Sequence, residues 1–241
     1  MIYILLPAYN EEKNLKKIFK KIKKNFKDKK KIRVVLIDDC SIDDTKKIAL
    51  KKNNFKIINK KHNKNKGLNI TMETGFKLIS KKANLNDIIV SLDSDNTHPI
   101  SLIPKMVKKI SQGNDIVIAS RFVKGSKVSG LSSWRQIMSR GAKLIFKIFY
   151  PFKNLNDYTC NFRAYKAKHI KKVLDNKNFF KNEDFNIAAK ILLYLITKNR
   201  NFKIAEVPFT LRYDLKIGNS KMRILKTILL TLRLVLIRKF N

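Results

Sequence analysis

Short apolar runs alternate with amphipathic segments through the first half of the chain. The apolar runs predict buried strands, and apolar residues that recur every three or four positions predict helices. The predicted strands cover residues 2–6, 32–37, 55–58, 88–92 and 115–119. The clearest helical face lies within residues 11–26 and carries Leu15, Ile18, Phe19, Ile22 and Phe26. Alternation of this kind predicts an α/β fold with a doubly wound, mostly parallel sheet.

The second half of the chain has a different pattern. Residues 132–152 mix aromatic and basic side chains, which predicts a basic amphipathic helix that either lies at an interface or packs on the sheet. Residues 204–211 predict a strand, and Pro208 places it at a sheet edge. A second basic, apolar helix is predicted over residues 223–240. We therefore expect one domain over residues 1–215, followed by a C-terminal amphipathic helix within residues 216–241.

The charge of the chain is strongly positive, with 54 Lys and Arg against 18 Asp and Glu and a net charge of +36. One explanation is a genome that favours lysine codons. The other is attraction to an anion such as a nucleotide, a nucleic acid or an acidic membrane face. Lysine runs without interleaved aromatic residues or a nucleic-acid module argue against specific nucleic-acid recognition.

Cysteine content and the N-terminal sequence bear on the compartment. Two cysteines imply no disulfide framework, and the first residues lack the pattern of a signal peptide, so we expect a cytoplasmic location. The longest apolar run near the C-terminus, residues 224–237, is interrupted by Lys226 and Arg233. It falls short of the roughly 20 apolar residues of a membrane-spanning helix.

Polar residues follow four of the predicted strands. Asp93-Ser94-Asp95 comes directly after the apolar run at residues 88–92, and similar polar segments cover residues 7–11, 38–45 and 119–122. Because open α/β sheets bind ligands at the carboxyl ends of their strands, these segments predict one site. Two carboxylates on a short turn suit Mg²⁺ or Mn²⁺ bridging a diphosphate. An isolated pair of this kind more often caps a turn, so the repeated pattern gives the prediction its weight.

These motifs, in this order, resemble the family 2 glycosyltransferases of GT-A fold over nearly the whole chain. Residues 157–164, 206–208, Arg212 and residues 218–221 sharpen the resemblance to the dolichyl-phosphate or polyprenyl-phosphate mannose and glucose synthases. The resemblance implies an inverting enzyme that moves a hexose from GDP-hexose or UDP-hexose to a polyprenyl phosphate at a membrane surface. It also implies Mg²⁺ or Mn²⁺ as cofactor.

The resemblance assigns roles residue by residue. The positions that match nucleotide contacts are Pro7, Tyr9, Glu11, Asp38, Asp39, Lys66 and Gly67. The metal positions are Asp93, Asp95 and Thr97, of which Asp93 also lies near the sugar and Thr97 replaces a common glutamine. The diphosphate and acceptor-phosphate positions are Arg121, Arg135, Ser139, Arg212, Ser220 and Lys221. Arginine suits them because its planar fork pairs two phosphate oxygens. We expect His98, before Pro99, to be structural.

Three positions depart from the usual glycines of the family. Cys40, Asp44 and Asn69 replace them. Asn and Asp tolerate a left-handed backbone, whereas Cys40 predicts a locally different turn or a tolerated strain.

The acceptor decides whether a catalytic base is needed. A hydroxyl acceptor must lose a proton, and Glu183 or Asp184 could serve as its base. A lipid phosphate is already ionised near neutral pH, because its second pKa is about 6, and needs positive guides instead. The arginines favour the lipid phosphate. The other readings are a hydroxyl acceptor and a non-catalytic nucleotide-binding or membrane-binding protein of the same fold. A nucleotidyltransferase is disfavoured because residues 7–11 contain no glycine.

The expected location is the cytoplasmic face of the membrane. Because no spanning helix is predicted, the chain would bind the bilayer peripherally, recruit a membrane-protein partner or use a soluble acceptor.

Overall fold

A computed structural model describes residues 1–51, 53–180, 186–199 and 201–216. The strands of the main sheet are β1 (Ile2–Ala8), β2 (Ile32–Asp38), β3 (Lys56–Lys61), β4 (Ile88–Ser91), β5 (Ile116–Ser120), β7 (Arg163–Lys166) and β8 (Ile204–Pro208). A two-stranded sheet contains β6 (Lys127–Ser129) and β9 (Thr210–Arg212). The α-helices are α1 (Glu12–Asn25), α2 (Thr45–Leu50), α3 (Gly67–Ser80), α4 (Ile103–Ser111), α5 (Ser133–Phe149), α6 (Ala167–Asp175) and α7 (Ile187–Lys198). Short 3₁₀ turns are η1 (Lys29–Lys31), η2 (Ile100–Leu102) and η3 (Tyr213–Leu215).

The strand order of the main sheet is β3-β2-β1-β4-β7-β5-β8. β7 runs antiparallel to β4 and β5, and the other pairs are parallel. This arrangement confirms the predicted doubly wound, mostly parallel sheet. β8 lies at the edge, where Pro208 pairs with Ser120, because proline cannot donate a hydrogen bond to a further strand.

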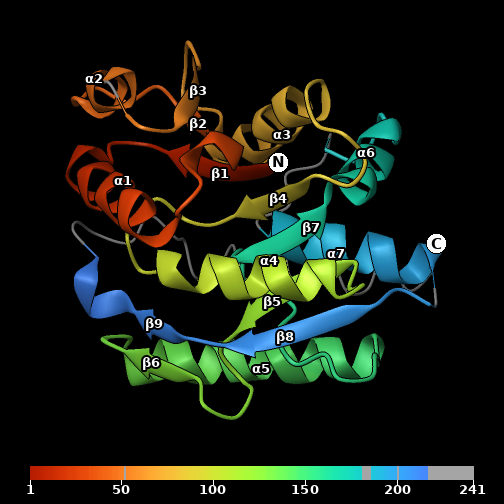
Figure 1. Cartoon of the computed structure of the whole chain (residues 1–241). Helices are drawn as coiled ribbons and strands as arrows, with labels where there is room; N and C mark the ends of the chain where they lie inside the picture. The colour runs from red at the N-terminus through yellow and green to blue at the C-terminus, as the bar shows by residue number, and fades with distance from the viewer. Residues whose placement is uncertain (52, 181–185, 200, 217–241) are drawn as a thin grey trace.

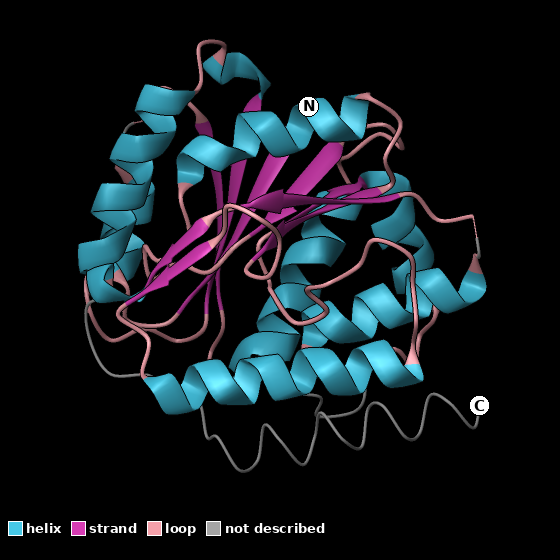
Figure 2. Cartoon of the chain, turned by 90° about the horizontal axis from the view of Figure 1, so that it is seen from below, coloured by secondary structure: helices cyan, strands magenta, loops and turns pink. Residues whose placement is uncertain are grey.

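Helices cover both faces of the sheet (Figures 1 and 2). α1 packs against α2 and η2 on one side, while α3, α6 and α7 contact one another on the other side. The apolar face predicted for α1 is buried in the core. α3 approaches β1 so closely that a Cβ added at Gly75 would lie 2.2 Å from Leu5 Cδ1. Glycine therefore permits the tight helix–sheet packing that positions the start of α3.

The strand register brings the ends of neighbouring strands to one edge of the sheet. Ala8 pairs with Asp38, Asp38 pairs with Lys61, and Ser91 of β4 pairs with Leu5 of β1. The loops that follow these strands therefore lie side by side, as the sequence predicts for a parallel sheet.

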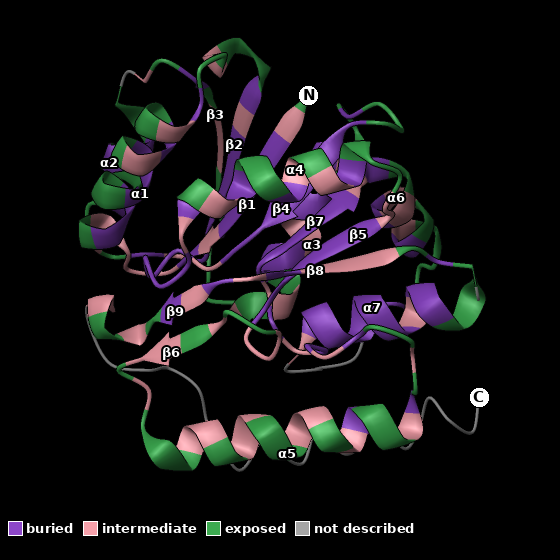
Figure 3. Ribbon diagram, turned by 60° about the horizontal axis from the view of Figure 1, so that its bottom comes forward, coloured by how far each residue is buried: buried purple, intermediate pink, exposed green. Residues whose placement is uncertain are grey.

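α5 confirms the helix predicted over residues 132–152, and it is the most exposed long helix in Figure 3. Phe146 is buried, whereas Trp134, Ile137, Leu144 and Ile148 are 58–64% exposed. Among the residues that the structure describes, no helix is both long enough and apolar enough to cross a bilayer. Residues 217–241, which contain the helix predicted over residues 223–240, lie outside the described part of the chain.

Candidate functional site

Asp39 follows β2 and lies at the centre of the predicted nucleotide-binding residues. Its Oδ1 accepts a hydrogen bond from the backbone N–H of Lys66 (2.9 Å), and its Oδ2 accepts one from Gly67 (2.8 Å). Gly67 has φ +80°, a conformation that glycine adopts without strain. The structure therefore brings Asp39, Lys66 and Gly67 together at the start of α3, as the motifs predict.

His62 is a partner of Asp39 that the sequence did not reveal. Its Nδ1 lies 2.7 Å from Asp39 Oδ1, and its Nε2 lies 3.0 Å from Thr74 Oγ1. The side chains of His62 and Asp39 are both buried. His62 follows β3, so this contact arises only when the ends of β2 and β3 meet. The imidazole fixes the orientation of the Asp39 carboxylate.

The loop after β1 interlocks with the loop after β2. The backbone N–H of Asp39 donates to Ala8 O (2.8 Å), and Asn10 Oδ1 accepts from the backbone N–H of Ile42 (2.9 Å). Three predicted nucleotide contacts are half-buried here, namely Pro7 at the end of β1 and Tyr9 and Glu11 after it. Pro7 and Tyr9 flank Ala8, whose carbonyl accepts the hydrogen bond from Asp39.

Asp38 precedes Asp39 at the end of β2. Its side chain is fully buried, and its Oδ1 accepts a hydrogen bond from the backbone N–H of Ser41 (2.7 Å). The hydrogen bond to Ser41 shapes the turn that carries Asp39. Among the described residues, Asp38 Oδ2 is buried and has no hydrogen-bond partner, so the predicted substrate contact stays a prediction.

Cys40 carries the backbone strain that its sequence position predicts. Its φ is +69°, in the left-handed region. Asp44 has φ −77°, and Asn69 lies within α3, so neither uses a left-handed backbone. Of the three substituted glycine positions, Cys40 is thus the strained one.

We expect Cys40→Gly to raise the free energy of unfolding by up to about 1 kcal/mol. A left-handed backbone costs a residue with a Cβ about 1–2 kcal/mol, and the greater freedom of glycine in the unfolded chain offsets part of the gain. Urea denaturation measures the change. Cys40→Ala is the control, because it removes the thiol and keeps the strain. An equal gain in both variants would contradict a backbone origin.

Asp95 lies on the turn after β4, and both of its carboxylate oxygens are engaged. Oδ1 accepts hydrogen bonds from the backbone N–H (3.2 Å) and hydroxyl (2.7 Å) of Thr97. Oδ2 lies 2.8 Å from Lys216 Nζ. Burial would raise the pKa of Asp95, but the Lys216 charge and these hydrogen bonds bring that pKa below its ordinary value. The carboxylate is therefore ionised at neutral pH, with Thr97 orienting it.

Asp93 is the more open carboxylate of the pair, with a side chain that is 40% exposed. Its Oδ1 accepts a hydrogen bond from Asn161 Nδ2 (2.9 Å), and its backbone N–H donates to His98 Nδ1 (3.2 Å). His98 is buried and stacks on Phe162 at 5.2 Å between ring centroids. This packing confirms the structural role predicted for His98.

Arg121 follows β5 and makes a buried ion pair. Its Nε and Nη2 donate to the two carboxylate oxygens of Asp157 (2.8 and 2.7 Å), and Nη2 also donates to Thr159 Oγ1 (2.6 Å). Burial opposes the charge of Arg121, but the adjacent Asp157 raises the pKa of its guanidinium. The Nε and Nη2 side of the Arg121 guanidinium thus holds the loop around Asp157. The sequence did not reveal Asp157 as the partner of Arg121. The charge of Arg121 still acts on Asp93.

The segment 212–216 brings further basic residues to the Asp95 turn. The backbone N–H of Arg212 donates to Thr97 O (3.2 Å). The guanidinium of Arg212 forms an exposed pair with Asp214 (2.7 Å). Arg135 of α5 donates from Nη1 to the hydroxyl of Tyr213 (2.7 Å). The segment 212–216 therefore connects α5, through Arg135 and Tyr213, to the predicted metal turn, through the Arg212 backbone.

The remaining predicted residues divide into two groups. Ser139 is half-buried on α5, one turn after Arg135. Glu183, Asp184, Ser220 and Lys221 lie outside the described residues.

The acidic turn has the chemistry of a site for a hard divalent cation. Within the described ranges, no group of three or more His, Cys, Asp or Glu side chains could hold a metal ion. The two carboxylates nevertheless fit Mg²⁺ or Mn²⁺, because Mg²⁺ is usually bound by one or two carboxylates together with substrate phosphates and water. Asp95 already attracts a cationic group, the ammonium of Lys216.

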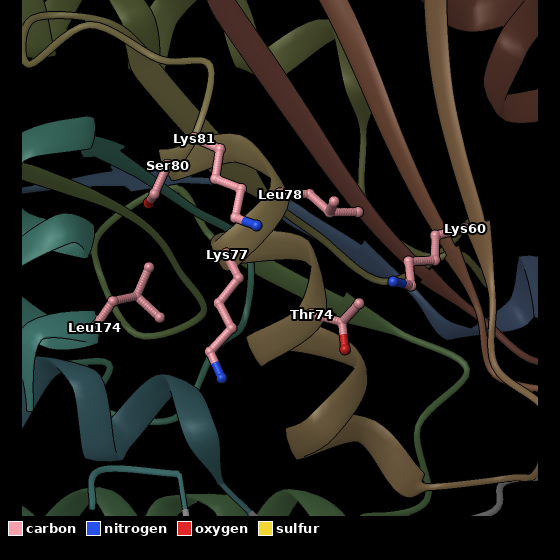
Figure 4. A pocket seen from close by; sticks show the side chains of 7 residues that line it. All are labelled: Lys60, Thr74, Lys77, Leu78, Ser80, Lys81 and Leu174. Carbon is pink, nitrogen blue, oxygen red and sulfur yellow. The ribbon is translucent and has the colours of Figure 1, made fainter. Parts of the chain in front are cut away.

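A separate cavity of about 570 Å³ lies along α3 (Figure 4). Its lining residues are Lys60, Thr74, Lys77, Leu78, Ser80, Lys81 and Leu174. It touches the site through Thr74, whose hydroxyl is hydrogen-bonded to His62. Its described lining contains no carboxylate, so the candidate site is the edge formed by the strand ends.

A mostly parallel sheet with acidic residues at its strand ends also occurs in solved glycosyltransferases of GT-A fold. The glucosyl-3-phosphoglycerate synthase of Mycobacterium tuberculosis, solved with Mn²⁺, UDP and glucosyl-3-phosphoglycerate, has this fold. The two structures align with a TM-score of 0.65 at 15% identity, over 99% of this chain and 79% of that one. Residues 3–174 match the family described as Glycosyl transferase family 2, and the chain belongs to that family.

Two relatives with assigned names are similar to this chain over most of its length. The dolichol-phosphate mannosyltransferase of Pyrococcus furiosus is 32% identical over 226 residues, which cover 92% of this chain. The chain spans 59% of the length of that relative. The polyprenol monophosphomannose synthase of Mycolicibacterium smegmatis is 24% identical over 226 residues, covering 91% of this chain and 80% of the relative.

Proposed function

We propose that this protein transfers a hexose from a nucleoside-diphosphate sugar to a polyprenyl phosphate, with inversion at the anomeric carbon. The observation that supports the proposal is that the segment 212–216 meets the acidic turn through the Arg212–Thr97 backbone hydrogen bond and meets Arg135 through Tyr213. Carboxylates for a metal–diphosphate and arginines for a second phosphate are the two features that this reaction needs. The names of both curated relatives support the same reaction.

The donor would lie along the ends of β1, β2 and β4. Asp39, oriented by His62, would contact the nucleoside, and Asp93 and Asp95 would hold Mg²⁺ or Mn²⁺ on the diphosphate. The metal, when bound, would stabilise the negative charge that develops on the leaving diphosphate. Arg121 adds a fixed positive charge near Asp93, which stabilises the same developing charge in a partly buried setting.

The acceptor step requires no base from the protein. An ionised phosphate oxygen of the polyprenyl phosphate attacks the anomeric carbon, a new carbon–oxygen bond forms, and the bond to the diphosphate breaks. Arg212 and Arg135 would orient that phosphate, because each guanidinium offers paired donors. The exposed pair between Arg212 and Asp214 contributes little stability and can exchange for a phosphate.

The test is a transfer assay with a panel of GDP-hexoses and UDP-hexoses, Mg²⁺ or Mn²⁺ and a short prenyl phosphate. The proposal expects a prenyl-phosphate hexose, identified by mass. Transfer to a sugar or protein hydroxyl with prenyl phosphate inert would instead support the Glu183 or Asp184 base. Nucleotide binding without any turnover would support a non-catalytic protein.

α5 would bring the site to the membrane surface. Trp134, Ile137, Leu144 and Ile148 recur at spacings of three, seven and four residues, so they share one helical face. Lys143 and Lys147 lie on the same helix and suit anionic lipid headgroups. A polyprenyl phosphate presented at the bilayer would then meet Arg135, which belongs to this helix.

We expect the double variant Ile137→Ser and Leu144→Ser to bind vesicles of anionic lipid about tenfold more weakly than the natural protein. Each change removes an exposed apolar side chain that could enter the bilayer. Vesicle sedimentation measures the binding. Leu85→Ser is the matched control, because Leu85 is 57% exposed outside α5. An equal loss in the control, or no loss in the double variant, would argue against α5 as the membrane face.

A further inference from the structure

Lys216 forms an ion pair with Asp95, the carboxylate that would bind the metal in the proposed function. Its Nζ lies 2.8 Å from Asp95 Oδ2, and both side chains are largely buried, with 19% and 12% exposed. The ammonium also lies 5.2 Å from the centroid of the Tyr213 ring. Because Thr97 engages Oδ1, Lys216 completes the hydrogen bonding of Asp95.

A divalent cation and the Lys216 ammonium cannot both contact Asp95 Oδ2 at close range. Mg²⁺ binds carboxylate oxygens at about 2.1 Å, so a metal on Oδ2 would lie next to Nζ and repel it. The backbone of the segment is held by the Arg212–Thr97 hydrogen bond and by Arg135 on Tyr213. The flexible four-carbon stem of lysine allows Nζ to move while this backbone stays in place.

A second cation of the same segment is paired in a similar way. Arg212 forms an ion pair with Asp214, so Arg212 and Lys216, which flank η3, are both paired with carboxylates. The segment follows β9 and lies beneath α1 in Figure 1. A cation released from Asp95 would remain beside Arg212, where the acceptor phosphate is placed by the proposed function.

We propose that Lys216 is an exchangeable counter-cation that holds Asp95 until a divalent metal binds, and that then becomes a ligand of the acceptor phosphate. This inference rests on the proposed function. Metal binding and acceptor binding would then be coupled. Displacement of Lys216 from Asp95 frees the carboxylate for the metal and the ammonium for the acceptor phosphate.

The test is Mn²⁺ binding to the full chain, measured by electron paramagnetic resonance without nucleotide. We expect Lys216→Met, which keeps the stem and removes the charge, to bind Mn²⁺ about five- to tenfold more tightly. Lys216→Arg keeps the charge and is expected to bind Mn²⁺ as the natural protein does. Lys105→Met, at an exposed lysine of α4, is the control for a general change in net charge.

Steady-state transfer tests the second half of the inference. The KM for prenyl phosphate is expected to rise about tenfold in Lys216→Met, with the donor KM changed less than twofold. Unchanged or weaker Mn²⁺ binding in Lys216→Met would overturn the inference. Tighter Mn²⁺ binding with an unchanged acceptor KM would overturn the phosphate role alone. Tighter Mn²⁺ binding in a protein that transfers no sugar to prenyl phosphate would count against the proposed function and uphold the exchange.

Discussion

Asp95→Asn is expected to lower the rate of sugar transfer by about 160- to 900-fold and to abolish the effect of Mn²⁺ on nucleotide affinity. The asparagine oxygen can still accept the Thr97 hydrogen bond, so the turn should keep its shape. What is lost is the negative charge that attracts a divalent cation, an electrostatic contribution of about 3–4 kcal/mol. Calorimetric titration of a nucleoside diphosphate with Mn²⁺, and again with EDTA, measures the change.

A matched control separates loss of the metal from a general change in charge. Asp28→Asn removes a carboxylate that is half exposed at η1 and is expected to leave both quantities unchanged. If Asp95→Asn kept metal-dependent nucleotide binding and a normal rate, Asp95 would not be a metal ligand.

Arg212→Ala is expected to lower transfer by about a hundredfold while nucleotide affinity changes less than threefold. The backbone of Arg212 is hydrogen-bonded to Thr97, and its exposed guanidinium pairs with Asp214 rather than with any of the predicted nucleotide contacts. Loss of a charge-assisted phosphate contact costs about 2–3 kcal/mol, which corresponds to this factor. Parallel measurements of the transfer rate and of the nucleotide dissociation constant test the separation.

The conservative variant supplies the control. Arg212→Lys keeps the charge and loses the planar fork, so partial activity is expected. Equal losses in transfer and in nucleotide affinity would place Arg212 on the donor.

Local sequence patterns predicted the frame of the site. Alternating strands and helices determine a parallel sheet, and a parallel sheet aligns the polar residues that follow its strands. Asp39, Lys66 and Gly67 were grouped by the family resemblance, and the structure joins them through the hydrogen bonds of Asp39. His98 could be assigned a packing role from the proline that follows it, and it stacks on Phe162.

The contacts between side chains far apart in the chain could not be predicted in the same way. Asn161 on Asp93 joins residues 68 positions apart, and Lys216 on Asp95 joins residues 121 positions apart. These pairs depend on where antiparallel β7 and the segment after β9 return to the sheet. Arg121 is a further example. Its motif predicts a phosphate contact, but the buried Asp157 accepts hydrogen bonds from two of its guanidinium nitrogens.

The most direct test is the position of Mn²⁺ in crystals of the protein grown with Mn²⁺ and UDP or GDP. The account predicts an anomalous scattering peak within about 2.2 Å of an Asp95 carboxylate oxygen, in contact with both the diphosphate and the turn that carries Asp93. A nucleotide bound at Asp39 with its diphosphate away from these carboxylates, or with Mn²⁺ elsewhere, would contradict it.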